Sequence, residues 1–492
     1  MKLGKLPRLL PGVHPDVPAG QADTEVLGVT HDSRRVLPGW VFVAIAGHQR
    51  DGAAFVEDAL ARGAVAVVSE RTQRLSRPVV QFVVVDARRS LAALSSSFFG
   101  KPSRRLQVVG VTGTNGKTTT TYMLRSILEA AGHRCGVIGT ISYETGRRSV
   151  PASITTPESA DVQELLAEMA AEGMEYAAME VSSHALCMHR VDFVHFAAAV
   201  FTNLSPEHMD YHRTITGYRE AKARLFRMLG PNAYAVVNAD DKAGAHIAAS
   251  TFARKMSYGL RHGDVRARVK GATLDGVDVA LSCAGGEADL RLPLIGVHNV
   301  YNALGAATSA LALGLDFDAV RDGLQRTVAV PGRLEPVPTN NGARVLVDFA
   351  HTDQALKSVL DSLRQVATKR ILVVFGAGGD RDKTKRPRMG RAVELGADAA
   401  WVTSDNPRGE DPALIIEDIL SGVRNRRRMH VQPDRQAAIA EALRAARPDD
   451  LVLIAGKGHE RTQRFKDTVI PFDDREAVRT ALAAQAPNSI GV

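Results

Sequence analysis

Residues 112–119, which read TGTNGKTT, have the types and the order of a phosphate-binding loop. Glycines in such a loop let backbone N–H groups converge on phosphate, and the helix N-terminus that follows adds positive potential. Lys117 could reach the β- and γ-phosphates of a nucleotide, and the Thr118 hydroxyl could bind Mg²⁺. The general pattern GxxxxGK[ST] requires glycine where this chain has Val111, so the match fails at one position. A turn rich in glycine and threonine that only caps a helix is the alternative.

Two later segments carry side chains that could serve a metal ion. Glu180 lies in EYAAMEVSSHAL at the carboxyl end of an expected strand, where open α/β sheets gather their ligands. A carboxylate there could complete a Mg²⁺ site, although a glutamate that caps a helix near Ser182 would occupy the same position. His208 lies in FTNLSPEHMDYH among acidic and histidine residues, and a metal or phosphate role competes there with a structural one.

The segments around these residues alternate between β-rich and helical runs. The chain has 492 residues, which at roughly 150 residues per domain predicts about three domains. Runs such as VFVAI, LQVVG, KRILVVFGAGG and LVLIAGKGHE alternate with helical stretches such as AAFVEDALARGA and QAAIAEALRAA. This alternation predicts parallel sheets with crossover helices, and hence an α/β fold. With breaks at KPSRR and at Pro331-Gly332, we expect domains at 1–101, 102–332 and 333–492.

The composition excludes several classes of protein. With 45% hydrophobic and 24% charged residues, the chain is typical neither of disorder nor of a coiled coil. Its three cysteines lie far apart and form no CxxC pair, so no disulfide framework and no thiolate zinc site is expected. Prolines interrupt the segment from Met1 to Pro18, and no apolar run approaches the ~20 residues of a membrane helix. We therefore expect a soluble, cytoplasmic protein without membrane insertion.

The net charge of +8 is compatible with nucleic acid or with anionic small molecules as partners. A nucleic-acid surface would combine basic with aromatic residues, but the basic cluster of Arg424 and Arg426–Arg428 contains no aromatic residue. We expect no nucleic-acid partner. A P-loop motor or switch is another alternative, but it would leave the segments DNPR (405–408) and GKGHE (456–460) without a purpose.

Taken together, the motifs resemble those of the Mur ligase family of ATP-dependent, amide-forming enzymes. The matching segments follow the family's order over nearly the whole chain: GTNGKTT (113–119), MEVSSHAL (179–186), FTNLSPEHMDYH (201–212), GYREAKARLF (217–226), GVHNVYNALGA (296–306) and PGRLE (331–335). The resemblance implies three domains, with a central P-loop parallel-sheet ATPase domain and a Rossmann-like C-terminal domain. Folylpolyglutamate synthetase shares this architecture, but THDSRRVLPGWVFVAIAGHQRDG (30–52) and DNPR argue against it.

The resemblance implies ATP as co-substrate and two Mg²⁺ ions, one on Thr118 and Glu180 and one on His208 and Lys222. Lys222 would act as a carbamate formed with CO₂, because an ammonium cannot ligate a cation whereas a carbamate offers anionic oxygens. Composition alone would make Lys222 a solvated helix lysine. The implied catalytic residues are Lys117, Lys222, His208 and Arg333. The implied ATP contacts are Gly113, Thr114, Asn115, Gly116, Lys117, Thr118, Thr119, His298, Asn302, Arg333 and Asp348.

The resemblance also implies UDP-MurNAc-L-Ala-D-Glu, that is UDP-N-acetylmuramoyl-L-alanyl-D-glutamate, as the substrate that is extended. Its contacts would be His31, Ser33, His48, Gln49, Arg50, Thr155, Thr156, Ser182 and Arg190. Two positions depart from the pattern, since Met188 replaces a frequent Gln and Ile154 replaces an Asn found in some relatives. These changes weaken single contacts without changing the assignment.

The amino acid to be added is indicated by Asp405-Asn406-Pro407-Arg408, because a guanidinium on a turn can bind a carboxylate bidentately. The family's diaminopimelate enzymes carry DNPR and its lysine enzymes do not, so meso-diaminopimelate is the implied substrate. Further contacts would come from Arg381, Gly456 and Glu460, the last for the distal ammonium. Arg381 could instead belong to the solvated run RDKTKR.

The implied reaction passes through an acyl phosphate and supplies a peptidoglycan precursor. The sequence does not choose among His208, Asp348 and His351 as the base for the incoming amine. A monomer is expected.

Overall fold

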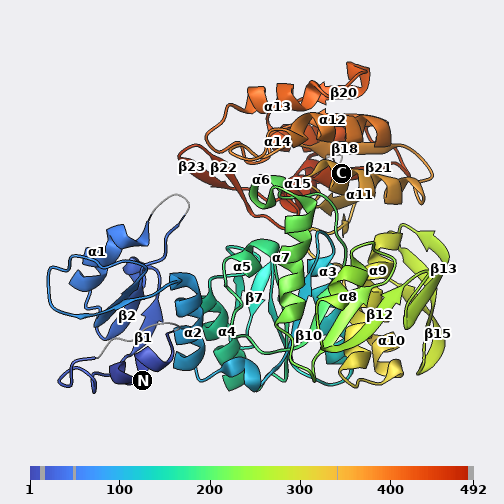
Figure 1. Cartoon of the computed structure of the whole chain (residues 1–492). Helices are drawn as coiled ribbons and strands as arrows, with labels where there is room; N and C mark the ends of the chain where they lie inside the picture. The colour runs from blue at the N-terminus through green and yellow to red at the C-terminus, as the bar shows by residue number, and fades with distance from the viewer. Residues whose placement is uncertain (11–16, 48–50, 341, 486–492) are drawn as a thin grey trace, which may run out of the picture. The chain divides into compact units, whose positions relative to one another are not determined.

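The computed structural model describes residues 1–10, 17–47, 51–340 and 342–485. The chain forms two compact units: Met1–Asp264 with Gly305–Gly323, and Val265–Leu304 with Leu324–Val492. Both units combine helices with parallel-rich sheets, so the predicted α/β class is confirmed (Figure 1). The three predicted domain ranges stay a prediction, because the division into two units follows neither of their boundaries.

The N-terminal part of the first unit is a four-stranded sheet in which every strand pair is parallel. Its strands are short apolar runs, and Asp86 caps the following helix by accepting from Arg89 N at 2.8 Å. The elements are the 3₁₀ turns Leu3–Arg8, Ser33–Arg35, Gly52–Phe55 and Pro102–Arg104, the strands β1 (Gly28–Thr30), β2 (Trp40–Val43), β3 (Ala66–Ser69) and β4 (Val80–Val83), and the helices α1 (Val56–Ala61) and α2 (Ala87–Phe98).

The larger sheet of the first unit has the strand order β12-β11-β10-β5-β9-β6-β7-β8. The strands from β12 to β6 are parallel, and β7 and β8 add antiparallel partners at one edge. The strands are β5 (Gln107–Thr112), β6 (Cys135–Ile138), β7 (Ser142–Glu144), β8 (Ser149–Pro151), β9 (Tyr176–Glu180), β10 (Phe196–Phe201), β11 (Tyr234–Asn238) and β12 (Arg254–Gly259). The helices are α3 (Lys117–Ala130), α4 (Ser159–Ala171), α5 (Ser183–Cys187), α6 (Met209–His212), α7 (Ile215–Arg227) and α8 (Gly244–Ala249).

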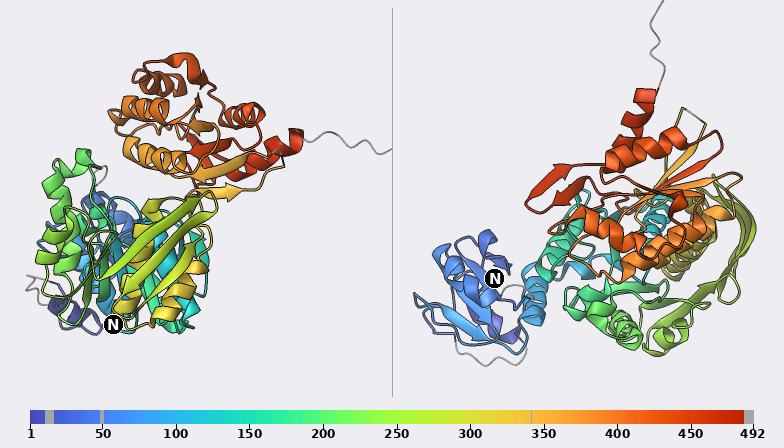
Figure 2. Two further views of the ribbon diagram at one scale, coloured as in Figure 1. Left: turned by 90° about the vertical axis from the view of Figure 1, so that its right-hand side faces the viewer. Right: turned by 90° about the horizontal axis from the view of Figure 1, so that it is seen from above.

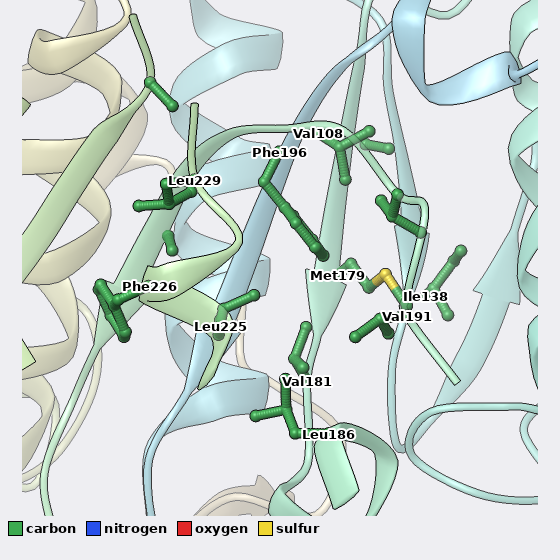
Figure 3. Packing of buried hydrophobic residues seen from close by; sticks show 14 of the residues in the cluster. Val108, Ile138, Met179, Val181, Leu186, Val191, Phe196, Leu225, Phe226 and Leu229 are labelled. Atoms are coloured by element: carbon green, nitrogen blue, oxygen red, sulfur yellow. The ribbon is translucent and has the colours of Figure 1, made fainter. Parts of the chain in front are cut away.

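The core beside this sheet is built from apolar strand residues and from one face of α7 (Figure 3). Val108, Met179 and Phe196 come from three neighbouring strands, and Leu225 and Phe226 come from the helix. All five side chains are buried, which at about 25 cal/mol per Å² makes this cluster a main source of stability for the sheet. The packing of Leu225 and Phe226 against these strands holds α7 beside the sheet.

The second unit contains an antiparallel meander and a six-stranded sheet of order β16-β17-β21-β18-β19-β20, parallel except at β16 (Figure 2). Its strands are β13 (Val265–Thr273), β14 (Gly276–Cys283), β15 (Gly286–Leu292), β16 (Glu335–Val337), β17 (Arg344–Asp348), β18 (Ile371–Phe375), β19 (Ala399–Val402), β20 (Met429–Val431), β21 (Leu451–Ala455), β22 (Thr462–Phe465) and β23 (Thr468–Pro471). Its helices are α11 (Asp353–Arg364), α12 (Lys385–Gly396), α13 (Pro412–Leu420), α14 (Arg435–Ala445) and α15 (Asp474–Gln485), with a 3₁₀ turn at Arg426–Arg428.

The remaining helices α9 (Val297–Ala312) and α10 (Phe317–Gln325) cross the division between the units. In the part of the chain that the structure describes, no helix combines the length and the apolar character needed to span a bilayer.

Candidate active site

The predicted phosphate loop joins β5 to α3, and its glycines are required by its geometry. A Cβ atom at Gly113 would lie 1.8 Å from Thr202 Oγ1, so no other residue fits without a shift. Gly116 has a φ of +88°, a backbone conformation that favours glycine, and α3 begins directly after it. Lys117 Nζ donates to the carbonyl oxygens of Gly113 at 3.0 Å and Thr114 at 2.8 Å, which places the ammonium over the loop.

The loop is held in shape by the residues that end the neighbouring strand β10. Thr114 N donates to Asn203 O at 2.9 Å, and Asn115 N donates to Asn203 Oδ1 at 3.0 Å. Thr202 Oγ1 donates to Asn115 O at 2.6 Å. Val111, where the general pattern has glycine, is fully buried inside β5, so the departure falls in the strand and not in the loop.

Glu180 ends β9 next to the loop, and its carboxylate faces hydroxyl and amide donors. Its Oε2 accepts from Thr118 Oγ1 and from Thr140 Oγ1, each at 3.0 Å, and its Oε1 accepts from Thr140 N at 2.7 Å. The side chain is buried, and no ion pair of Glu180 is found within the described ranges. The capping alternative is wrong, since Ser182 itself caps α5 through Ala185 N at 3.2 Å.

A hydroxyl and a carboxylate are hard oxygen ligands of the kind that Mg²⁺ prefers. Among the residues that the structure describes, no group of three or more His, Cys, Asp and Glu side chains could hold a metal ion. The Thr118 hydroxyl and the Glu180 carboxylate are the groups here that could hold such an ion. The sequence missed Thr140, although its place after the buried run CGVIG is the same kind of signal that drew attention to Glu180.

Lys222 lies on α7 and is 1% exposed, so the expectation of a solvated helix lysine is wrong. The packing of α7 against the core turns this position inward. Its Nζ lies 4.2 Å from the centre of the Tyr218 ring, and no salt bridge of Lys222 is present in the described part of the chain. Burial, reinforced by the charge of Lys117, holds the pKa of Lys222 well below its usual value.

His208 and Lys222 approach the same tyrosine, within a group of aromatic and histidine rings. The His208 ring lies 6.3 Å from that of Tyr218 and 4.8 Å from that of His184, and His212 lies 4.8 Å from Tyr218. Burial lowers the pKa of His208, and burial together with neighbouring positive charge lowers the pKa of His184 and of His212 to about 4. The sequence missed Tyr218, which stands one helical turn before Lys222 and could have been found from that spacing.

Residues assigned to the extended substrate gather beside Glu180. Thr155 Oγ1 lies 3.1 Å from Thr140 Oγ1, and Thr156 Oγ1 donates to the carbonyl oxygen of Glu180 at 2.9 Å. Ser182 N donates to Thr156 Oγ1 at 3.1 Å. These threonine and serine side chains therefore form one hydrogen-bonded group around the end of β9, where Glu180 lies.

Arg190 belongs to the same hydrogen-bonded group, because its Nη1 donates to Thr156 O at 3.1 Å and its Nε to Glu158 Oε1 at 2.9 Å. In the N-terminal part of the first unit, His31 follows β1, and its buried Nδ1 has no hydrogen-bond partner among the described residues. Ser33 begins the 3₁₀ turn after it. The expected contacts His48, Gln49 and Arg50 lie outside the described residues.

The expected adenine residues His298 and Asn302 lie on the first turns of α9 in the second unit. His298 Nδ1 lies 3.2 Å from Ser362 Oγ, and burial lowers the pKa of its ring to about 4. Asn302 Nδ2 donates to Asn299 Oδ1 at 2.9 Å. The two asparagines therefore form an amide pair one helical turn apart.

Arg333 lies just before β16, and Asp348 is the last residue of the neighbouring strand β17. The Arg333 guanidinium lies 4.8 Å from the centre of the Phe349 ring. Asp348 is buried and accepts from Leu334 N and from Ala350 N, each at 2.8 Å. Burial raises the pKa of Asp348, and the charge of Arg333 opposes that rise. His351 Nδ1 lies 2.8 Å from Phe349 O, within the same loop.

The residues expected to bind the added amino acid collect at the carboxyl ends of β18, β19 and β21. Arg408 has a φ of +50°, and its Nη1 donates to Gly379 O at 2.7 Å. Burial and the nearby charge of Arg381 lower the pKa of Arg408. Asn406 Nδ2 donates to Glu460 Oε2 at 2.8 Å, so DNPR and GKGHE are in direct contact.

Asp405 and Gly456 lie on the inner side of this group. A Cβ atom at Gly456 would lie 2.6 Å from Asp405 Oδ2, a buried oxygen with no hydrogen-bond partner in the described ranges. Lys457 is fully buried between these segments and was not singled out by the sequence. Pro407 is buried in the turn and holds the backbone between Asn406 and Arg408.

Comparisons with known proteins agree with the order of these motifs. Three family models match the chain: "Mur ligase family, catalytic domain" at residues 25–98, "Mur ligase middle domain" at 111–310 and "Mur ligase, glutamate ligase domain" at 332–458. The chain is 42% identical over 481 residues to a UDP-N-acetylmuramoyl-L-alanyl-D-glutamate–2,6-diaminopimelate ligase of Caldanaerobacter subterraneus subsp. tengcongensis, covering 97% of this chain and 99% of the relative. It is 43% identical over 465 residues to the ligase of the same name from Solibacter usitatus, covering 94% of each chain.

A solved structure of a ligase with this name has a TM-score of 0.69 and 32% sequence identity to the chain. The similarity covers 99% of this chain and 100% of that structure.

Proposed function

The chain belongs to the Mur ligase family, and from this we propose that it joins meso-diaminopimelate to UDP-N-acetylmuramoyl-L-alanyl-D-glutamate with the use of ATP. It is an ATP-dependent ligase that forms an amide bond for peptidoglycan precursor synthesis. The observation that carries the choice of amino acid is the contact between DNPR and GKGHE, which sets the cationic Arg408 near the anionic Glu460. These two groups match the carboxylate and the ammonium at the distal end of diaminopimelate.

The first step would transfer the γ-phosphoryl group of ATP to the D-glutamyl carboxylate. A carboxylate oxygen attacks phosphorus, the bond to the ADP oxygen breaks, and an acyl phosphate forms. Lys117, which lies over the phosphate loop, and Arg333 would neutralise the charge on the transferring group. His298, Asn302 and Asp348 would contact the nucleotide.

Thr118 with Glu180, and His208 with a carbamate of Lys222, would hold two Mg²⁺ ions. Mg²⁺ held by these residues would supply positive charge to the phosphate oxygens. The burial of Lys222 against Tyr218 supports the carbamate, because a buried lysine that forms no salt bridge among the described residues gains an anionic ligand function when its amine adds CO₂ and releases a proton. The oxygens of Glu180 already converge with the Thr118 hydroxyl.

The second step would be attack of the free amine of diaminopimelate on the acyl phosphate, through a tetrahedral intermediate that releases phosphate. Arg408 and Arg381 would bind the distal carboxylate and Glu460 the distal ammonium. Holding the far end in this way orients the reacting amine, which is worth several kcal/mol in effective concentration. Asp405, Asn406, Pro407 and Gly456 shape this subsite.

The UDP end of the other substrate would bind to the N-terminal part of the chain through His31, Ser33, His48, Gln49 and Arg50. The unpartnered Nδ1 of His31 supports this, because a buried ring nitrogen needs a hydrogen-bond partner that a ligand can supply. Thr155, Thr156, Ser182 and Arg190 would hold the muramyl peptide next to Glu180.

The three domain ranges 1–101, 102–332 and 333–492 would carry these three tasks in order: UDP binding, ATP binding and amino-acid binding. We further propose that the protein is a monomer that works in the cytoplasm, where ATP and both substrates are available.

The test is an incubation of the protein with ATP, Mg²⁺, UDP-N-acetylmuramoyl-L-alanyl-D-glutamate and either meso-diaminopimelate or L-lysine. Phosphate release and product mass are measured for each amino acid. We expect a tripeptide product with meso-diaminopimelate and at least about a hundredfold lower rate with L-lysine, because lysine leaves Arg408 without a partner.

No product with either amino acid would overturn the ligase proposal, and equal rates would overturn the argument from Arg408. ATP hydrolysis that needs no amino acid would instead favour a motor or switch.

A further inference from the structure

Lys457 lies directly after β21 and Gly456, and its side chain is fully buried. A buried ammonium is costly unless it is paired and hydrogen-bonded, so its partners define its role. Its Nζ donates to Asn406 Oδ1 at 3.1 Å and to Glu460 Oε2 at 2.9 Å. In the sheet order β21-β18-β19, Lys457 thus links the end of β21 to the turn after β19.

These contacts determine the orientation of the Asn406 amide. An ammonium only donates, so the oxygen of the amide must face Lys457, where it also accepts from Arg464 N at 3.0 Å. The amide nitrogen is thereby directed at Glu460 Oε2, at 2.8 Å. Glu460 Oε2 receives two donors from the protein, one from an amide and one from an ammonium.

The second carboxylate oxygen of Glu460 is left for another partner. Within the described ranges, Glu460 Oε1 accepts no hydrogen bond, and the side chain is 34% exposed. Nearby, the Arg408 guanidinium is anchored on Gly379 O at 2.7 Å. The Arg408 guanidinium and the Glu460 carboxylate are therefore each held by hydrogen bonds with other residues, and in the described part of the chain the two do not form a salt bridge with each other.

We propose that Lys457 is a positioning residue that holds Glu460 for the distal ammonium of the amino-acid substrate, and that it thereby selects acceptors with an amino group at their far end. This inference rests on the proposed function. Lys457 acts only through Glu460 and Asn406 and does not touch the substrate. Without its ammonium, the Glu460 carboxylate would be free to rotate away from the distal ammonium of a bound substrate, while Arg408 would stay anchored on Gly379 O and keep its contact with the distal carboxylate.

The test compares two acceptors, meso-diaminopimelate and L-2-aminopimelate, which keeps both carboxylates but lacks the distal amine. Lys457→Met should raise the KM for meso-diaminopimelate about 10- to 100-fold, with kcat changed less than about threefold, because a positioned charge contact is lost in binding. The KM for L-2-aminopimelate and the KM for ATP should stay unchanged. Lys457→Arg, which keeps a buried donor cation, should recover part of the discrimination between the acceptors.

Lys466→Met is the matched control, because Lys466 is exposed between β22 and β23 and should leave all constants unchanged. If Lys457→Met does not fold by circular dichroism, Lys457→Gln keeps a hydrogen-bond donor at the same depth and carries the same expectation. An equal loss of kcat/KM for both acceptors in either variant would overturn the positioning role.

The parent protein is assayed first, so that the two proposals fail separately. No tripeptide from the parent and meso-diaminopimelate would refute the proposed function. Product from the parent, with unchanged discrimination in the Lys457 variants, would refute only the role of Lys457.

Discussion

Two regions differ in how their buried charges are compensated. The phosphate-loop region of the first unit comprises residues 112–119 with Glu180 and Lys222, and the amino-acid region of the second comprises residues 405–408 and 456–460 with Arg435 and Asp474. Beside the phosphate loop, Glu180 meets hydroxyl and amide donors, and Lys222 meets an aromatic ring. No salt bridge of either residue is found within the described ranges. In the amino-acid region, Arg435 pairs with Asp474 and Lys457 pairs with Glu460.

This difference indicates how far the buried charges of each region depend on a ligand for compensation. Charges without protein counterions are costly until a ligand neutralises them, and the proposed nucleotide with its metal ions would do so in the phosphate-loop region. Charges that are already paired keep a fixed geometry, so the amino-acid region is suited to discrimination between similar ligands. Four variants test this contrast between the two regions.

Arg435→Met should have the largest effect, because it breaks a pair in which both side chains are fully buried. Arg435 Nε and Nη2 donate to the Asp474 carboxylate at 2.7 and 2.8 Å, and Nη2 also donates to Ala455 O. Loss of one partner leaves an uncompensated buried carboxylate and should lower the free energy of unfolding by about 3–5 kcal/mol in urea titrations. The double variant Arg435→Met/Asp474→Leu should recover most of that loss.

Arg426→Met is the control, because the Arg426–Glu417 pair is more than half exposed and should be worth at most about 1 kcal/mol. Equal losses for Arg435→Met and Arg426→Met would contradict the view that the amino-acid region depends on its buried pairs.

Lys222→Met should lower kcat about 10²- to 10³-fold while leaving the free energy of unfolding at least as high as in the parent. In the proposed mechanism, the rate falls because a group that stabilises transferring charge is removed. Stability does not fall because the lost cation has no salt bridge and its burial is costly. Steady-state phosphate release and urea titration measure the two effects, and withdrawal of bicarbonate should lower the activity of the parent only.

Lys242→Met changes an exposed lysine of the same unit and should alter neither quantity. Full activity in Lys222→Met would show that the lysine is not needed, and a loss of stability near that of Arg435→Met would remove the contrast between the regions.

Arg408→Lys should lower kcat/KM for meso-diaminopimelate about a hundredfold and leave the KM for ATP unchanged. A lysine keeps the charge but cannot bind Gly379 O and a carboxylate with one planar group. Kinetics with each substrate varied in turn provide the measurement. Arg461→Lys, at an exposed position, should have no effect, and an equal rise in the KM for ATP would argue against a role limited to the amino acid.

Glu410→Gln should have the smallest effect, about 1.5–3 kcal/mol of stability at pH 7, through loss of charged hydrogen bonds to the buried Arg386. The Arg386 guanidinium lowers the pKa of Glu410 to about 2, below its usual 4.5. The parent therefore owes stability to this carboxylate above pH 4.5 and loses it as the pH falls toward 2. The difference between parent and variant should shrink over that window in urea titrations.

Glu417→Gln, at an exposed position, should show little difference at any pH. A constant difference between Glu410→Gln and the parent from pH 7 to pH 2 would contradict the assigned pKa direction.

Local patterns were enough to predict the class of fold and the position of the phosphate loop. Alternating β and helical runs predicted the parallel sheets, and Gly116-Lys117 predicted the start of α3, because both signals depend on residues near in sequence. The division at residues 101 and 332 could not be tested in the same way. The two compact units depend on contacts between distant segments, and these contacts leave no local signal.

The same limit applies to the candidate active site, where contacts between distant segments also leave no local signal. Position and resemblance predicted site roles for Glu180, Lys222 and Arg408, although composition alone favoured a solvated Lys222. The sequence analysis did not identify Thr140 and Lys457. The structure buries Lys222 and Lys457 because the packing of α7 and the order of the strands turn them inward. The types of chemical group and the starts of the strands and helices follow from the local sequence. Whether a charge meets a counterion follows from the fold, since pairing and burial depend on segments far apart in the chain.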